Sequence, residues 1–281
     1  MIPVNDPITG DGFRALCDAV LDEREVRFDH SEIIRTVFVK TDLLPVFTAR
    51  YLPRLTHPFI LLTHNSAKGI DDSYQPLLDD RRLVRWYAQN TLIRSPKLKS
   101  LPLGIANARW PHGDIAVLRH VAAIAPPADK WCYVNIRVPS SSGRRPVLEH
   151  FSHLPFATTV LSRKPFDEYL RDIAEHRFVI SPPGKGVDCH RTWETLYLQR
   201  IPIVQRHIAV EQFSDLPILF VDDWHEVTKD LLSRVYQEMK SKTWNLRRLS
   251  LDYYRREWEA VLEEAYAKQC LDPNNTAIPS L

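Results

Sequence analysis

Short β-branched or aromatic runs alternate with helical patterns along most of this chain. Such alternation predicts βα units, which build parallel sheets covered by helices. The runs that predict strands are residues 36–39, 59–63, 83–87, 98–105, 131–136, 158–161, 178–181, 201–204 and 218–221. The patterns that predict helices are residues 11–25, 114–123, 165–175, 188–199 and 226–240. The chain is therefore expected to be an α/β protein.

A Pro-Pro pair, Pro126-Pro127, interrupts this alternation near the middle of the chain. The 281 residues leave room for two domains, since domains run to roughly 100 to 200 residues each. We place the boundary at this pair, with domains at 1–125 and 128–268 and a disordered tail at 269–281. Ligands of open parallel sheets bind beyond the carboxyl ends of the strands, so the loops that follow strands are the candidate sites.

The composition excludes several classes of protein. The chain is 44% hydrophobic and 26% charged, as in globular domains, which excludes a disordered or coiled-coil protein. Its 37 basic residues against 35 acidic ones leave a formal charge of +2, so the strong basic field that nucleic-acid binding requires is missing.

Cysteine usage and hydropathy predict a cytoplasmic protein. The cysteines contain no C-x-x-C pair, which argues against a zinc site and against a disulfide framework and favours a reducing compartment. They are Cys17, Cys132, Cys189 and Cys270. The amino terminus lacks the features of a signal peptide, and no apolar stretch approaches the ~18 residues that a membrane span needs.

The loop after the predicted strand 178–181 combines glycines, prolines and charged residues, reading Ser181-Pro182-Pro183-Gly184-Lys185-Gly186-Val187-Asp188-Cys189-His190-Arg191-Thr192-Trp193-Glu194. Gly184 and Gly186 would let the backbone approach a ligand, and Asp188 is expected to cap the helix that follows. Helix N-termini attract phosphate, and Lys185, His190 and Arg191 would add positive charge. The loop thus predicts an anion site that suits a diphosphate.

A purely structural interpretation of this loop stays open, with Asp188 as a simple cap and Arg191 and Glu194 as a surface ion pair. Two nucleotide motifs are excluded. Lys185 is followed by Gly186 rather than Ser or Thr, so the loop is not a Walker A motif. The third glycine of the dinucleotide fingerprint is also missing.

From residue 178 to residue 204 the sequence resembles the donor-binding signature of exostosin-like glycosyltransferases, approximately F-x-x-x-P-x-G-x-G-x-D-x-x-R-x-W-E-x-L-x-x-G-x-I-P-I-V. The resemblance continues into 216–224 and, upstream, into His64-Asn65-Ser66, 86–90, 102–107 and 110–113. It implies a GT-B fold, in which two Rossmann-like domains with parallel sheets face each other across an interdomain cleft. One position departs from the signature: Gln199 stands where the family usually has glycine, and its side chain is expected to narrow the donor pocket.

The resemblance and the loop chemistry together predict the residues that bind a nucleotide-sugar donor. Arg191 is expected near the diphosphate and Glu194 near ribose or sugar hydroxyls, while Arg137 ends the strand that precedes a basic loop. The full donor-binding set is Arg137, Ser181, Pro183, Gly184, Lys185, Gly186, Asp188, His190, Arg191 and Glu194.

The amino-terminal half is expected to hold the acceptor and the general base. Transfer with inversion needs a base within ~3 Å of the attacking hydroxyl, and the candidates are His64, Asp71 and Asp72. The family pattern tends to place an aspartate directly after His-Asn-Ser, where this chain has Ala67, so a solvated acidic turn is the open alternative.

Polar and aromatic residues in three loops suit carbohydrate, because sugar rings stack on aromatic faces while amides bind their hydroxyls. The acceptor-side candidates are Asn65, Ser66, Asn90, Trp110 and His112. For Trp110, as for Trp86, the alternative is a core position. The basic amphipathic segment 244–258 is expected to pack across a domain interface, with contact to an anionic membrane as the less favoured alternative.

The sequence therefore predicts a hexosyl- or pentosyltransferase that moves a sugar from a nucleotide diphosphate to a hydroxyl of a glycan or glycoconjugate. Inversion follows from the resemblance. No metal or other cofactor is expected, since a helix N-terminus and Arg191 would stabilise the leaving diphosphate. Two alternatives stay open: a non-catalytic scaffold that binds nucleotide or glycan, and another α/β enzyme that acts on phosphorylated substrates.

Overall fold

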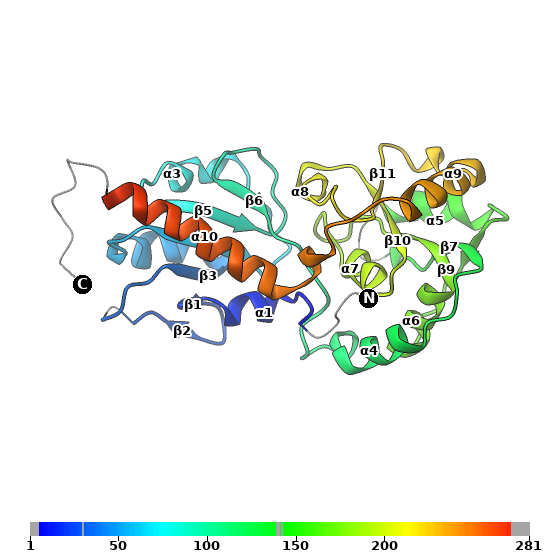
Figure 1. Ribbon diagram of the computed structural model, residues 1–281, viewed down its shortest axis with the longest axis horizontal. Helices are drawn as coiled ribbons and strands as arrows, with labels where there is room; N and C mark the ends of the chain where they lie inside the picture. Colours follow the sequence, from blue (N-terminus) through cyan, green and yellow to red (C-terminus); the bar gives the residue numbers. More distant parts are fainter. Residues whose placement is uncertain (1–5, 30, 139–140, 142, 271–281) are drawn as a thin grey trace. The chain divides into compact units, whose positions relative to one another are not determined.

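The computed structural model describes residues 6–29, 31–138, 141 and 143–270, without the side chains of 269 and 270. The chain forms two compact units that alternate along the sequence (Figure 1). Unit 1 comprises Met1–Asp11 and Pro102–Ser250, and unit 2 comprises Gly12–Leu101 and Leu251–Leu281. Each unit has its own largely parallel sheet, so the predicted α/β class is confirmed, and the arrangement is compatible with two Rossmann-like domains.

Within the described residues, the sheet of unit 1 has five strands in the order β11-β10-β9-β7-β8, and all neighbours are parallel. The strands are β7 (Lys130–Val134), β8 (Ala157–Thr159), β9 (His176–Ile180), β10 (Ile201–Gln205) and β11 (Leu219–Val221). The chain runs from β7 to β8 in one direction and then returns to the other side of β7 for β9. The neighbours β7 and β9 therefore form a topological switch point, the place where open α/β sheets bind ligands.

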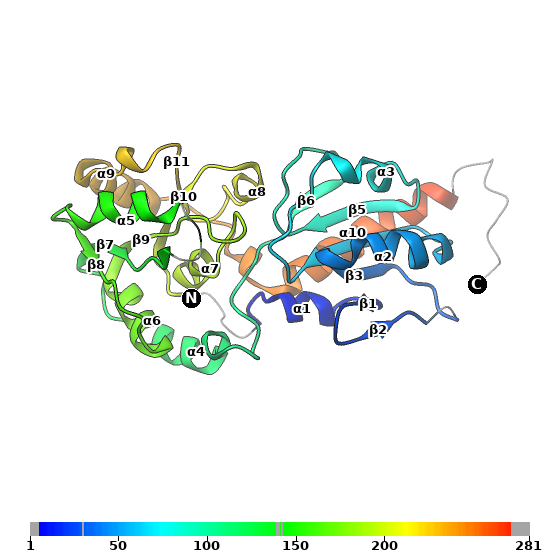
Figure 2. The ribbon, with the colours of Figure 1, turned by 180° about the vertical axis from the view of Figure 1, so that it is seen from behind.

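The reversal of strand order places helices on both faces of this sheet, because parallel crossovers are right-handed. The helices of unit 1 are α4 (Ile115–Ile124), α5 (Arg144–Ser152), α6 (Phe166–Glu175), α7 (His190–Tyr197), α8 (Ile208–Glu211) and α9 (Lys229–Lys240). Helices α5 and α9 cover one face and bury Phe151 and Leu232 against the strands (Figure 2). On the other face α4, α6 and α7 pack together, and the Tyr133 hydroxyl of β7 donates to Asp172 of α6 at 2.8 Å.

The described part of unit 2 has six strands in the order β2-β1-β3-β4-β5-β6, and only the terminal pair β2 and β1 is antiparallel. They are β1 (Ala19–Leu21), β2 (Val26–Arg27), β3 (Thr36–Lys40), β4 (Phe59–His64), β5 (Leu83–Ala88) and β6 (Leu98–Ser100). From β3 to β6 each strand is added on the same side of the one before. The crossover helices of this unit are therefore expected on a single face.

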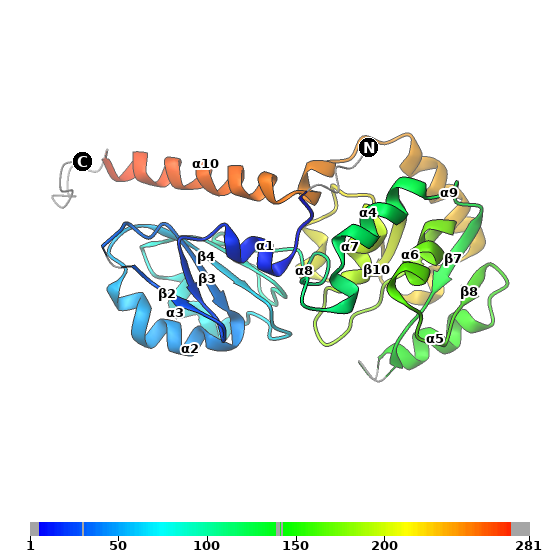
Figure 3. The ribbon, with the colours of Figure 1, turned by 90° about the horizontal axis from the view of Figure 1, so that it is seen from below.

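The helices of unit 2 are α1 (Gly10–Ala15), which crosses the unit boundary, α2 (Leu44–Val46), α3 (Gln75–Leu78) and α10 (Leu251–Cys270). The crossover helices α2 and α3 follow that expectation, whereas α10 lies on the opposite face of the sheet (Figure 3). Residues of α2 and α3 share one apolar cluster with one face of the sheet. Helix α10 packs against β4 and β5 and buries Tyr254 and Trp258 (Figure 3).

Several sequence-based boundaries are wrong. The predicted helix 11–25 ends at Ala15, because the apolar run Ala19–Leu21 pairs with β3 and is buried as a strand. The predicted strand 98–105 ends at Ser100. The boundary predicted at Pro126-Pro127 lies inside unit 1, since α4 packs against α6 and α7, and the chain changes unit after residues 11, 101 and 250 instead.

The carboxyl-terminal segment 244–258 is divided between the units, with residues 244–250 in unit 1 and the rest in α10 of unit 2. Helix α10 covers the sheet of its own unit and keeps Arg255 and Arg256 exposed in ion pairs with Asp252. It extends to Cys270, so the predicted tail loses its first two residues, and 271–281 lie outside the described residues. In the described ranges no helix combines the length and the apolar character needed to cross a membrane.

Candidate anion site in unit 1

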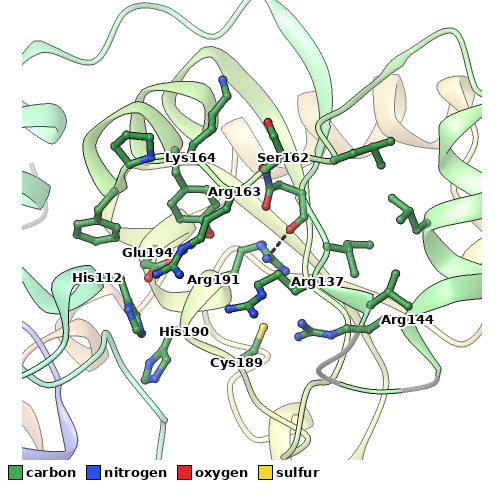
Figure 4. A pocket seen from close by; sticks show the side chains of 18 of the residues that line it. His112, Arg137, Arg144, Ser162, Arg163, Lys164, Cys189, His190, Arg191 and Glu194 are labelled. Carbon is green, nitrogen blue, oxygen red and sulfur yellow. Dashed lines mark hydrogen bonds between the residues drawn. The ribbon is translucent and has the colours of Figure 1, made fainter.

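A cavity of about 840 Å³ lies at the carboxyl ends of β7, β8 and β9 (Figure 4). Its walls are residues 135–138 after β7, 161–165 after β8 and 189–191 after β9, with further side chains from α5, α6 and α7. The volume lies within the roughly 300–1,000 Å³ typical of small-molecule sites. The cavity therefore occupies the switch point of the sheet.

The cavity wall is strongly cationic. Of the described residues that line it, five are arginine or lysine and one carries a carboxyl group. The cations are Arg137, Arg144, Arg163, Lys164 and Arg191, and the carboxyl group belongs to Glu194. Two imidazoles, those of His112 and His190, also line the cavity, with ring centroids 6.1 Å apart. A concave site lined by one sign of charge concentrates ligands of the opposite sign, so this cavity favours anions.

Arg191 has hydrogen-bonding capacity that the described protein does not use. Its Nη2 donates to the backbone oxygen of Asn135 at 2.5 Å, which ties the first turn of α7 to the end of β7 (Figure 4). Its Nε and Nη1 atoms are buried and have no hydrogen-bond partner within the described residues. Unpaired buried donors are unusual and destabilising. An oxyanion in the cavity would satisfy them.

Glu194 is the acidic group of this cationic wall. Its Oε2 accepts a hydrogen bond of 2.9 Å from the Tyr169 hydroxyl. Burial raises the pKa of Glu194 to about 7, against the opposing effects of that hydrogen bond and of the Arg191 charge. Near neutral pH Glu194 therefore exists partly as a carboxylate, which accepts hydrogen bonds, and partly as the protonated acid, which can also donate one.

Arg144, which lines the cavity, also holds the loop after β9. Its Nε donates to the Pro183 carbonyl oxygen at 2.7 Å and its Nη2 donates to that of Pro182 at 3.1 Å. A Cβ atom on Gly184 would lie only 3.0 Å from the same Nη2, so glycine leaves room for this contact. Burial lowers the pKa of the Arg144 guanidinium.

The predicted donor-binding residues divide into two groups. Arg137, His190, Arg191 and Glu194 line the cavity, as does His112, which was predicted on the acceptor side. The other six shape the loop instead and are not among the lining residues; they are Ser181, Pro183, Gly184, Lys185, Gly186 and Asp188. Ser181 bonds Thr192 of α7 through their hydroxyls at 2.8 Å, Gly184 donates to the Gly186 carbonyl at 2.9 Å, and Lys185 is exposed.

The expectation that Asp188 caps α7 is wrong, since Cys189 occupies the N-cap position. The Asp188 carboxylate is buried and accepts hydrogen bonds from the Leu103 backbone N–H at 2.8 Å and the Trp193 indole at 2.7 Å. Burial raises its pKa to about 6 despite these donors. Asp188 thus links Leu103, near the start of the segment 102–250 of unit 1, to Trp193 of α7.

The expectation that Gln199 narrows the pocket is also wrong. Gln199 is exposed and follows the end of α7 with φ 57°, the left-handed conformation that favours glycine. The Gln199 N–H donates to the Leu196 carbonyl at 2.9 Å, and the Arg200 N–H donates to that of Thr195 at 3.0 Å. This is the Schellman motif that ends many helices. The glycine of the signature thus fits the left-handed backbone conformation at this position.

The predicted base candidates belong to unit 2. His64 ends β4 and is buried, and its Nδ1 accepts a hydrogen bond of 2.8 Å from the Asn65 N–H. Asp71 is exposed and caps a short turn, and hydrogen bonds from Ser73 lower its pKa below the usual range. Asp72 is exposed in the same turn. Asp71 and Asp72 are thus the accessible members of the three.

The remaining acceptor-side candidates lie in both units. In unit 2, Asn65 and Asn90 adopt φ values of 60° and 57°, and the Asn90 side chain donates to the Ser66 carbonyl at 3.5 Å. In unit 1, Trp110 is 51% exposed and stacks on His112, so its core alternative is wrong. Trp86 does occupy a core position, where its indole donates to Thr63 at 2.9 Å.

Sequence reasoning missed much of the cavity wall. The missed polar residues are Asn135, Arg144, Ser162, Arg163, Lys164, Tyr169 and Cys189. The basic pair Arg163-Lys164 follows a predicted strand, which was a usable signal. Arg144 belongs to the basic loop and helix start that follow Arg137, where the sequence explained it equally well as a solvated residue, and Tyr169 is recognisable only when α6 is placed beside α7.

No protein-family model matches this chain, and no curated protein matches it significantly. In the described part of the chain, no three His, Cys, Asp or Glu side chains cluster as metal ligands would. The sequence-based expectation of a reaction without metal stays a prediction.

Proposed function

We propose that this chain is a glycosyltransferase of the GT-B type that moves a sugar from a nucleotide-diphosphate-sugar to a hydroxyl of a glycan or glycoconjugate. The supporting observation is the cationic cavity at the β7/β9 switch point, into which Arg191 presents two buried donors without partners. Parallel α/β sheets bind nucleotides at such points. The resemblance of residues 178–204 to a donor-binding signature supports the same assignment.

In this proposal the cavity holds the diphosphate and the adjoining sugar or ribose. Arg191 and Arg137 pair with the phosphate oxygens, helped by the positive end of α7. Glu194 and Tyr169 bind hydroxyl groups. As the bond from sugar to phosphate breaks, negative charge grows on the leaving diphosphate, and preorganised cations stabilise that charge most effectively.

The general base and the acceptor belong, in the same proposal, to the loop 63–72 of unit 2. Asp71 is one candidate, since its carboxylate is exposed, although hydrogen bonds from Ser73 lower its pKa and so weaken it as a base. Asp72 remains an alternative. His64 is less suited, because it is buried and its Nδ1 already accepts a hydrogen bond.

The cationic cavity also favours a second candidate, an α/β enzyme that acts on small phosphorylated substrates. This alternative uses Arg137, Arg191 and the cavity volume equally well. It differs in predicting no preference for a nucleoside or for a sugar on the diphosphate.

The experiment is a binding series by isothermal titration and thermal shift, with inorganic phosphate, pyrophosphate, nucleoside diphosphates and nucleotide-sugars. One nucleoside diphosphate should bind best and stabilise the protein by about 2.7 kcal/mol at a hundred times its Kd. Arg191→Ala should weaken that binding by about 30-fold or more, since it removes a buried charged partner. Arg145→Ala is the matched control, because Arg145 is exposed on α5 and is not among the lining residues.

The results separate the proposals. Release of the bound nucleotide from its sugar conjugate, stimulated by a glycan acceptor and lost in Asp71→Asn, supports glycosyl transfer. Binding of pyrophosphate as tightly as any nucleotide-sugar would favour the phosphorylated-substrate enzyme. Tight nucleotide binding without any transfer would favour a scaffold.

A further inference from the structure

Cys189 presents a thiol to the cationic cavity. It lines the cavity at the N-cap position of α7 and is half-buried. In Figure 4 its sulfur lies between the side chains of Arg137 and Arg144. Arg144 and Arg191 line the same cavity as this sulfur. Partly exposed cysteines in positive surroundings are the reactive ones.

The surroundings of Cys189 differ from those of two other cysteines. Cys17 and Cys132 are buried in the apolar cores of their units, and burial raises the pKa of each thiol. Thiols in such positions are chemically inert. The Cys189 sulfur instead lies 3.0 Å from the Ser181 hydroxyl oxygen and 3.8 Å from that of Thr192. Its neighbours are polar, and the cavity gives reagents access to it.

A second observation shows what kind of reagent the cavity would admit. The unpaired Nε and Nη1 donors of Arg191 and the excess of cations call for an anionic group beside this sulfur. A disulfide that carries carboxylates supplies both partners at once, since its carboxylates pair with the cations while its sulfur meets the thiol. A cationic disulfide would be repelled from the same cavity.

We propose that Cys189 is a modification site for anionic disulfides, such as those of small acidic thiol peptides, and that the mixed disulfide closes the anion cavity. The Cys189 thiol loses its proton to solvent and its sulfur attacks one sulfur of the reagent. The S–S bond of the reagent breaks, the mixed disulfide forms, and the other half leaves as a thiolate. The reagent is the only oxidant. The loss of ligand binding rests on the proposed anion-binding function, whereas the reactivity does not.

The first test compares two disulfides of opposite charge, dithiobis(nitrobenzoate), a dianion, and cystamine, a dication. All proteins carry Cys270→Ser, because the side chain of Cys270 is not described. Relative to their rates with free cysteine, the dianion should modify one thiol of the folded protein about tenfold faster than the dication. Cys189→Ser should abolish this fast reaction.

Arg137→Gln provides a second test in case Cys189→Ser does not fold. Arg137 is exposed, so its substitution is not expected to disturb the fold. It should lower the preference for the dianion severalfold and leave the thiol reactive. Equal normalised rates for the two reagents in the parent protein would overturn the inference. So would a fast reaction that persists in Cys189→Ser.

The second test uses inorganic pyrophosphate as a competitor. Saturating pyrophosphate should slow modification of Cys189 by about tenfold or more, and the modified protein should no longer be stabilised by pyrophosphate. Modification that leaves pyrophosphate binding intact would show that the sulfur does not close the cavity. If the protein binds pyrophosphate but no nucleotide, the proposed glycosyl transfer fails while this inference stands.

Discussion

The sheets of both units are largely parallel, but the loops at the carboxyl ends of their strands differ. Strand order reverses between β7 and β9 in unit 1. In unit 2 it reverses between β1 and β3, beside the antiparallel β2, whereas β3 to β6 follow one another in one direction. At the reversal in unit 1 the loops diverge around a cavity of about 840 Å³. In unit 2 the loops after β4 and β5 join instead, since Ile70 N–H donates to Asn90 O at 3.0 Å and Leu92 N–H donates to Ile70 O at 2.8 Å.

This difference shows that a polar loop after a strand is not enough to make a site. Both units have such loops, and the sequence marked both as candidates. Where the connections after β7 and β9 leave in opposite directions, side chains of unit 1 line a cavity, whereas the loops after β4 and β5 hydrogen-bond to each other. The following predictions test whether the two units differ as separately packed cores and as sites.

The largest expected effect concerns the core of unit 2. Trp258 of α10 is 2% exposed and packs against the rings of Phe13 and Tyr87, with centroids 6.0 and 5.7 Å away. Trp258→Ala should destabilise the protein by about 3–5 kcal/mol. Hydrogen exchange should accelerate in β4 and β5, while β7 and β9 keep their protection if the units are separate cores. Equal acceleration in both sheets would show a single cooperative unit.

The second prediction concerns the pH dependence of unit 1. The pKa of Glu194 is about 7 in the folded protein, above its ordinary value near 4.5, so between these values the folded state holds a proton that the unfolded state has lost. The contribution of Glu194 to the free energy of unfolding is therefore fully present below about pH 4.5. It decreases by up to about 3 kcal/mol as the pH rises through 7.

Denaturant unfolding between pH 4.5 and 8 measures this effect in the wild type and in Glu194→Gln. The decline should be smaller in the variant, because its amide does not titrate and can still accept from Tyr169, while the part that comes from the raised pKa of Asp188 persists in both proteins. Glu168→Gln, at an exposed position on α6, is the matched control. A wild-type profile parallel to that of Glu194→Gln would contradict the assignment.

The smallest effect concerns positive φ angles, which occur in both units. Gln199→Gly should stabilise the protein by about 0.5–1 kcal/mol, because glycine adopts φ 57° without a Cβ penalty. Asn90→Gly, also at φ 57°, should gain less, since asparagine tolerates this conformation better than glutamine. Urea unfolding of both variants compares the gains, and an equal or larger gain at Asn90 would contradict the argument.

Most elements of the fold were predictable from local pattern. The strands at β3, β4, β5, β9 and β10 and the helices α4, α6, α7 and α9 lie where the sequence predicted them, within a few residues. Periodicity is a property of neighbouring residues, so it survives without knowledge of the rest of the chain. The segment after Ala15 was misassigned because pairing with β3, rather than its own pattern, makes it a strand.

The site was only partly predictable for the same reason. The sequence identified Arg137, His190, Arg191 and Glu194 because they follow strands or share a face of the helix opened by a glycine loop. It assigned Asp188 and Gln199 wrong roles, since a cap and a helix end depend on the backbone conformation around them.

The sequence by itself determined the α/β class and the positions of most strands, and it identified four of the charged or polar residues that line the cavity. Local periodicity and residue chemistry carry that information. Only the tertiary structure decided which strands are neighbours, where the units divide and which cations share one cavity. Those features depend on contacts between distant segments, such as Asn135 with Arg191 and Arg144 with Pro183, which no local pattern encodes.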